Sequence, residues 1–148
     1  MKNSKGLIYR FLRNQSHITL SAPGKDGSPE GITVNYFVDG DQLYVYITSE
    51  DYTKYPNQLA DTEIAGVVSA DYKTLQLVAH CKRLTDKRAS VIQNLVNKTD
   101  PNARYFFTTS TKFYHILPSI LRYQDYSKRP VENAFYEVDA ATAKLQDF

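Results

Sequence analysis

The chain has 148 residues and a formal net charge of +2, with 42% apolar and 23% charged residues. This length predicts one domain over residues 1–148, and the composition excludes a disordered chain. The small excess of positive charge is scattered through the sequence, which argues against nucleic acid as the main partner.

The N-terminal segment has its apolar residues at helical spacing. Ile8, Phe11 and Leu12 would share one face of a helix over residues 4–15. Basic residues interrupt this segment, so we expect neither a signal peptide nor a membrane span. The single cysteine, Cys81, cannot form an internal disulfide, which agrees with a reducing compartment. We therefore expect a cytoplasmic protein.

After this helix, apolar and polar residues alternate with the period of a β-strand. Residues 17–22 and 31–38 flank a segment dense in glycine and proline, which predicts a hairpin. Residues 39–41 form a second tight turn, and residues 42–48 return as the third strand. Three consecutive antiparallel strands result.

The rest of the chain predicts further strands and two more helices. Pro56 would sit in the first turn of a brief helix, and Asp86 would cap a later one. The expected elements are a helix over 53–61, strands over 63–70 and 75–84, a helix over 87–98, strands over 112–117 and 120–126, and an edge strand over 135–138. About six antiparallel strands with three short helices predict a mainly β fold, an antiparallel six-stranded barrel with peripheral helices.

The segment from Leu43 to Leu59 carries the clearest functional signal. An apolar and aromatic strand ends in the hydroxyls of Thr48 and Ser49, and Lys54 follows within one loop. Hydroxyl donors and an ammonium group at one strand end are suited to a phosphate. The alternative is structural, because such hydroxyls often satisfy backbone groups at a strand end and a loop lysine is usually solvated.

The order of these motifs resembles that of the pyridoxamine 5'-phosphate oxidase-like family of FMN-binding split barrels. The resemblance spans most of residues 5–96, and residues 113–126 match the family's closing strand. The motifs that carry it are Phe11-Leu12-Arg13, Gly27-Ser28-Pro29 before Thr33-Val34-Asn35-Tyr36, Leu43 to Thr48 followed by Thr53-Lys54 and Asn57-Gln58-Leu59, and Leu75-Gln76-Leu77 leading to Thr85-Asp86.

The resemblance implies a six-stranded split β-barrel that forms a homodimer, with FMN at the subunit interface and a small-molecule substrate. It implies an FMN-dependent oxidoreductase that takes electrons from a reduced nicotinamide donor and passes them to an unknown acceptor. The implied cofactor-binding residues are Thr33, Val34 and Asn35 beside the flavin ring, Ile47, Thr48 and Ser49 toward the ribityl chain and phosphate, Thr53 and Lys54 at the phosphate, and Gln76 at the ring.

Two departures from the family pattern shape this interpretation. Thr53 stands where many members carry an arginine before the phosphate lysine. The segment after Tyr126 lacks the Arg-His signature of true pyridoxamine-phosphate oxidases, so we do not expect that reaction. The missing arginine favours an alternative, a flavin-free split barrel that acts as a small-ligand-binding or stress-associated protein. A weaker alternative is a barrel for single-stranded nucleic acid, because exposed tyrosines among basic residues can stack on bases.

Other chemistries find little support. His17, His80 and His115 do not have a metal-ligand spacing with one another or with Cys81. His80 and Cys81 are neighbours in an expected strand, so their side chains should point to opposite faces and cannot share a proton. We expect Cys81 to be a small core residue. Gln76 has an alternative as well, since it could simply face solvent on the outside of the barrel.

Overall fold

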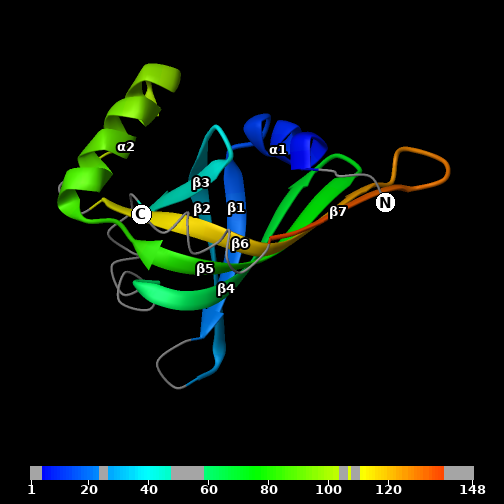
Figure 1. The fold of residues 1–148 in the computed structure, drawn as a ribbon, viewed down its shortest axis with the longest axis horizontal. Helices are drawn as coiled ribbons and strands as arrows, with labels where there is room; N and C mark the ends of the chain where they lie inside the picture. Colours follow the sequence, from blue (N-terminus) through cyan, green and yellow to red (C-terminus); the bar gives the residue numbers. More distant parts are fainter. Residues whose placement is uncertain (1–4, 24–26, 48–58, 104–106, 108–110, 139–148) are drawn as a thin grey trace.

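The computed structural model describes residues 5–23, 27–47, 59–103, 107 and 111–138 of the chain (Figure 1). Within these residues it has two helices and seven strands. They are α1 (Lys5–Arg13), β1 (His17–Pro23), β2 (Pro29–Asp39), β3 (Gln42–Ile47), β4 (Asp61–Ala70), β5 (Lys73–Arg83), α2 (Asp86–Thr99), β6 (Lys112–Asp125) and β7 (Glu132–Glu137).

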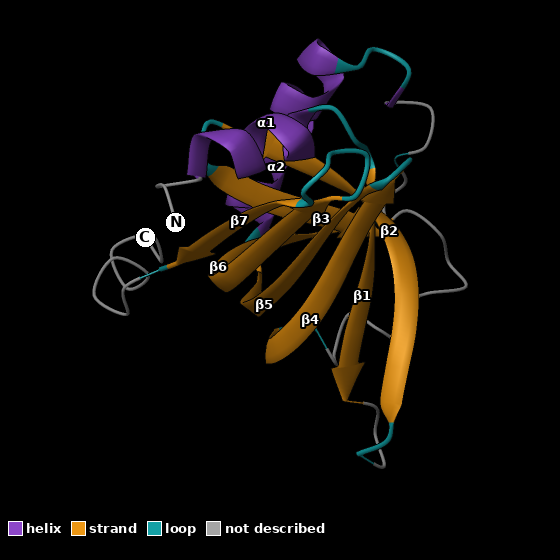
Figure 2. Cartoon of the chain, turned by 90° about the vertical axis from the view of Figure 1, so that its right-hand side faces the viewer, coloured by secondary structure: helices purple, strands orange, loops and turns teal. Residues whose placement is uncertain are grey.

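The strands form one antiparallel sheet that closes on itself. Their order is β3-β2-β1-β4-β5-β6-β7, and an additional pairing between β3 and β6 joins the first six strands into a barrel. The seventh strand, β7, extends the sheet beyond β6. Figure 2 shows the strands fanning out beneath the two helices. The predicted mainly β fold, a six-stranded antiparallel split barrel with short helices, is confirmed.

The last long strand differs from the prediction. Residues 112–117 and 120–126 were expected as two strands, but β6 runs without a break from Lys112 to Asp125. Pro118 lies in its middle, opposite Ala79, where the register between β5 and β6 shifts. A proline lacks the backbone N–H of the ladder and is tolerated at such an irregularity. Ser119 Oγ donates to the carbonyl of Val78 at 3.1 Å and supports the strand there.

Two helix predictions also need correction. The side chain that caps α2 is that of Thr85, whose Oγ1 accepts a hydrogen bond from the backbone N–H of Arg88 at 3.3 Å. Asp86 instead lies in the first turn, where its negative charge is favoured by the helix dipole. The helix expected over residues 53–61 falls mostly outside the described residues, but Leu59 and Ala60 are not helical and β4 begins at Asp61.

The core fills the barrel and is covered by α1. The four buried residues of this helix are Ile8, Tyr9, Phe11 and Leu12. The hydroxyl of Tyr36 on β2 donates to the carbonyl of Leu12 in the last turn of α1, which ties the helix to the sheet. A second cluster lies under α2, where Ile92 and Val96 pack with Tyr44 and Phe113. Neither described helix has the length and apolar character needed to span a bilayer.

Two buried tyrosines provide a matched test of this packing. The Tyr36→Phe substitution removes the hydrogen bond to Leu12, so we expect it to lower the free energy of unfolding by about 1 kcal/mol. At this chain length that loss corresponds to a fall in Tm of about 2–4 °C. Thermal unfolding of the two proteins measures the difference.

The control is Tyr114→Phe. The hydroxyl of Tyr114 is fully buried and has no hydrogen-bond partner among the described residues, so its removal should leave stability unchanged or raise it. Equal destabilisation by both substitutions would show that the hydroxyl of Tyr36 contributes nothing specific.

Candidate cofactor site

One row of side chains runs across the outside of the sheet in register. Each residue in the row is directly opposite the next on the neighbouring strand, from β2 through β1, β4, β5 and β6 to β7. We call this the outer row, and its members are Thr33, Thr19, Val67, Gln76, Arg122 and Phe135. Buried residues alternate with them along β1, β4 and β5, so the row faces away from the core.

The structure places three of the predicted cofactor residues on this outer side. Thr33 and Gln76 belong to the outer row and are three strand spacings apart, about 14 Å. Asn35 lies two residues beyond Thr33 and pairs with His17 on β1. Thr33 Oγ1 is hydrogen-bonded to Thr19 Oγ1 at 3.0 Å. The side-chain amides of Asn35 and Gln76 have no hydrogen bond within the described residues, so both can bind a ligand.

The side chains of two other predicted residues point into the barrel core. Val34 is 5% exposed and Ile47 is 3% exposed, and both belong to the barrel core. Only their backbone groups can therefore contact a ligand on the outside of the sheet. The alternation of Val34 with Thr33 and Asn35 already carries this signal. That the backbone of Val34 and Ile47 contacts a cofactor stays a prediction.

The predicted phosphate-binding residues lie outside the described part of the chain. Thr48, Ser49, Thr53 and Lys54 all follow the end of β3 at Ile47, and the structure describes the chain again from Leu59. Their part in holding a phosphate stays a prediction.

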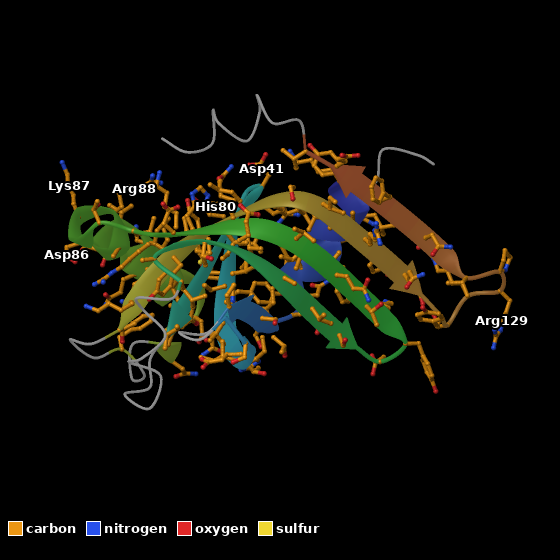
Figure 3. All side chains as sticks on the ribbon, turned by 90° about the horizontal axis from the view of Figure 1, so that it is seen from below. Asp41, His80, Asp86, Lys87, Arg88 and Arg129 are labelled. Carbon is orange, nitrogen blue, oxygen red and sulfur yellow. The ribbon has the colours of Figure 1, made fainter. Side chains whose placement is uncertain are left out.

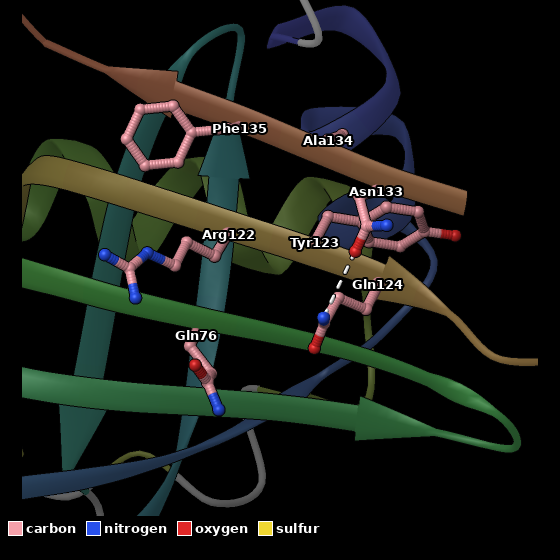
Figure 4. Close-up of a pocket in the computed structure, with 7 residues that line it drawn as sticks. All are labelled: Gln76, Arg122, Tyr123, Gln124, Asn133, Ala134 and Phe135. Carbon is pink, nitrogen blue, oxygen red and sulfur yellow. Dashed lines mark hydrogen bonds between the residues drawn. The ribbon is translucent and has the colours of Figure 1, made fainter. Parts of the chain in front are cut away.

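Two adjoining cavities open along the outer row. One of about 530 Å³ is lined by Gln76, Arg122 and Phe135, together with Tyr123, Gln124, Asn133 and Ala134 (Figure 4). The other, of about 270 Å³, is lined by Val67, Val78 and Ile120 and shares Gln76 and Arg122 with the first. Gln76 and Arg122 therefore stand at the junction of the two cavities.

Arg122 was not among the residues predicted from the sequence. It is an exposed cation in an otherwise apolar strand segment, Ile120-Leu121-Arg122-Tyr123. Its Cζ lies 5.9 Å from the centre of the Phe135 ring, and no carboxylate among the described residues pairs with it. Strand alternation alone predicts its exposure, but only the register brings it opposite Gln76.

Solved structures share this fold. A pyridoxamine 5'-phosphate oxidase-related, FMN-binding protein from Nostoc punctiforme aligns with a TM-score of 0.63 and 13% identity over 95% of this chain and 93% of that one. A protein from Clostridium acetobutylicum related to general stress protein 26, of the pyridoxinephosphate oxidase family, aligns with a TM-score of 0.66 and 12% identity over 92% and 95% of the two chains. The chain has the pyridoxamine 5'-phosphate oxidase-like split-barrel fold.

A third neighbour binds a different group. A heme-binding protein from Mycobacterium smegmatis aligns with a TM-score of 0.59 and 14% identity over 89% of this chain, which spans 56% of that protein. No protein-family model and no curated protein sequence matches the chain. The likeness thus shows the split-barrel fold, while the ligand must be argued from the site itself.

A charged cluster also lies on the outside of this split barrel. His80 is labelled on β5 in Figure 3. Its Nδ1 is hydrogen-bonded to Glu63 Oε1 at 2.8 Å, and its Nε2 is hydrogen-bonded to Asp61 Oδ1. Burial lowers the pKa of His80, but hydrogen bonds to Glu63 and Asp61 and their negative charges outweigh that effect and raise it above the ordinary value of 6.5. The two carboxylates therefore favour the protonated form of the ring.

The neighbouring Cys81 lies on the opposite face, as the sequence predicted. Its side chain is buried in the barrel core, and burial raises the pKa of the thiol to about 12. A thiol with this pKa is not a nucleophile at neutral pH. No group of three or more His, Cys, Asp or Glu side chains among the described residues has an arrangement that would hold a metal ion.

The raised pKa of His80 predicts the direction in which stability changes with pH. A pKa that is higher in the folded state contributes stability below about pH 6.5, and this contribution is lost as the pH rises through the folded-state pKa. We expect NMR titration of the His80 ring to give a pKa above 6.5. The double substitution Asp61→Asn with Glu63→Gln should lower that pKa and flatten the fall in stability above pH 6.5. An unchanged pKa in the double variant would contradict the assignment.

Proposed function

We propose that the chain is an FMN-binding flavoprotein of the pyridoxamine-phosphate oxidase-like type. We further propose that it acts as an oxidoreductase with a reduced nicotinamide as donor. The observation that carries the proposal is the position of Gln76. Its side-chain amide has no hydrogen bond within the described residues and lies at the junction of two largely apolar cavities, on a fold shared with FMN-binding proteins. A flavin ring has carbonyl and nitrogen groups that need such a partner within a largely apolar slot.

The residues present fit this cofactor in distinct ways. The amide of Gln76 would hydrogen-bond the edge of the ring, and Asn35 would serve the same purpose from β2. Lys54, with Thr48 and Ser49, would hold the phosphate through charge-assisted hydrogen bonds. Bound flavin would supply the electron transfer, and the protein would fix its position and exclude water.

Removal of the proposed phosphate lysine tests the cofactor directly. We expect purified protein to quench FMN fluorescence in a titration, with one flavin per chain at saturation. The Lys54→Ala substitution should weaken binding about tenfold or more, because it removes a charged hydrogen-bond donor. Lys98→Ala, on the exposed surface of α2, is the control and should bind FMN like the unchanged protein.

Two outcomes would count against the assignment. If FMN is never quenched by the unchanged protein, the flavoprotein proposal fails. If Lys54→Ala binds FMN as tightly as the control, the phosphate is held elsewhere and the assigned site is wrong.

We also propose that the cofactor lies at the interface of a homodimer. Val67 and Val78, on neighbouring strands β4 and β5, are 41% and 42% exposed and line the apolar cavity of the outer side. Water-exposed apolar side chains beside a ligand cavity are suited to burial by a second copy of the chain.

A charge placed on this surface tests the dimer. Val78→Asp should shift the protein to a monomer in size-exclusion chromatography with light scattering, because a carboxylate would be buried without a partner. Val91→Asp on α2 is the control, since Val91 is 56% exposed and α2 contributes no residue to the apolar cavity. A dimer in both variants would place the interface elsewhere. The FMN affinity should fall together with dimerisation if both chains form the site.

Heme is the second candidate ligand, as a specific form of the flavin-free alternative. A structural neighbour binds heme, and His17 is an exposed histidine that pairs with Asn35 at the outer side of the sheet. Titration with hemin separates the candidates, because a sharpened Soret band without any flavin quenching would favour heme.

A further inference from the structure

We propose that Arg122 and Gln76 form a subsite for the carboxylate of a planar, conjugated acid. The subsite lies in the outer-row cavity of about 530 Å³ (Figure 4). The binding itself needs no flavin. The further statement that the bound acid is the substrate or product of the redox reaction rests on the proposed function.

The position of Arg122 is fixed by the sheet. It pairs with Gln76 on β5 and with Phe135 on β7, so the three side chains stand side by side on adjacent strands. Its guanidinium lies 5.9 Å from the centre of the Phe135 ring, which orients the cation. Arg122 is therefore placed by contacts with its neighbours but has no charge partner among the described residues.

The other amides of this cavity are already paired. Gln124 Nε2 donates to Asn133 Oδ1 at 3.1 Å, and Gln124 Oε1 accepts from the hydroxyl of Tyr126 at 2.8 Å. Within the described residues, the side chains of Gln76 and Arg122 make no hydrogen bond. The polar capacity of the cavity is thus concentrated at one point, where a guanidinium and an amide lie next to each other.

A guanidinium and an adjacent amide select a carboxylate. The planar fork of arginine donates two parallel hydrogen bonds to the two oxygens of a carboxylate, and the Gln76 amide can add a third. A phosphate could also bind the fork, but the surroundings are those of an aromatic acid. The Phe135 ring lines the larger cavity beside the guanidinium, and Val67 and Ile120 line the smaller one.

Isothermal titration with 2-naphthoate and its neutral counterpart 2-naphthamide tests the subsite. The unchanged protein, with and without FMN, should bind the carboxylate about tenfold or more tightly than the amide. Arg122→Gln should abolish this preference, and Arg122→Lys should restore only part of it because an ammonium lacks the fork. Arg10→Gln is the control, as it removes the same charge from the exposed side of α1 and should keep the full preference.

Each other result would overturn the proposal. No binding of 2-naphthoate, equal binding of acid and amide, or a preference that survives in Arg122→Gln would exclude a carboxylate subsite at this point. Displacement of FMN by 2-naphthoate in a one-to-one ratio would show that the cavity is the flavin's own site rather than a separate one.

The same titrations separate this inference from the proposed function. A preference that depends on Arg122 in a protein that never binds FMN would support the subsite and refute the flavoprotein. Tight FMN binding, together with naphthoate binding that the Arg122→Gln substitution does not change, would support the flavoprotein and refute the subsite. Circular dichroism of each variant checks that it is folded.

Discussion

The antiparallel ladder between β3 and β6 is the contact on which the rest of the structure depends. It joins Leu43 to Ile116 and Ile47 to Lys112, and so closes a sheet whose other pairings would leave β3 as an open edge. Closure gives every strand of the barrel an inside and an outside. The inside becomes the core beneath α1, and the outside carries the outer row.

Because side chains alternate between the two faces of each strand, closure of the barrel decides which residues lie on its outer face. Thr33, Gln76 and Arg122 are far apart in the sequence, but each alternates with buried neighbours, so all three must face outward once the barrel closes. The register then determines which of them are adjacent. Val34 and Ile47 are excluded from side-chain contact with an outer ligand by the same rule, because both point into the core.

Local patterns in the sequence were sufficient for most of the strands and for the outward direction of Gln76, but not for the residues that lie beside Gln76. The pairing of Gln76 with Arg122 depends on the register between β5 and β6, which shifts between Val78 and Ala79. No periodicity in the chain reports that shift, and the sequence predicted two strands where β6 is continuous. Thr85 was missed as the cap of α2 because Asp86 is an equally good capping residue and only the backbone geometry distinguishes them.

The distribution of hydrogen bonds on the outer side gives a physical reason to place a ligand there. Thr19 pairs with Thr33, Gln124 with Asn133, and His80 with Glu63, so polar groups around the outer side satisfy one another. The side chains of Gln76 and Arg122 lie between these pairs without a hydrogen bond in the described part of the chain. If a ligand or a second protein chain covers these two side chains, it must offer each of them a hydrogen-bond partner. A buried donor without such a partner costs about 1–3 kcal/mol. A flavin edge or a carboxylate meets that requirement, whereas a purely apolar occupant would not.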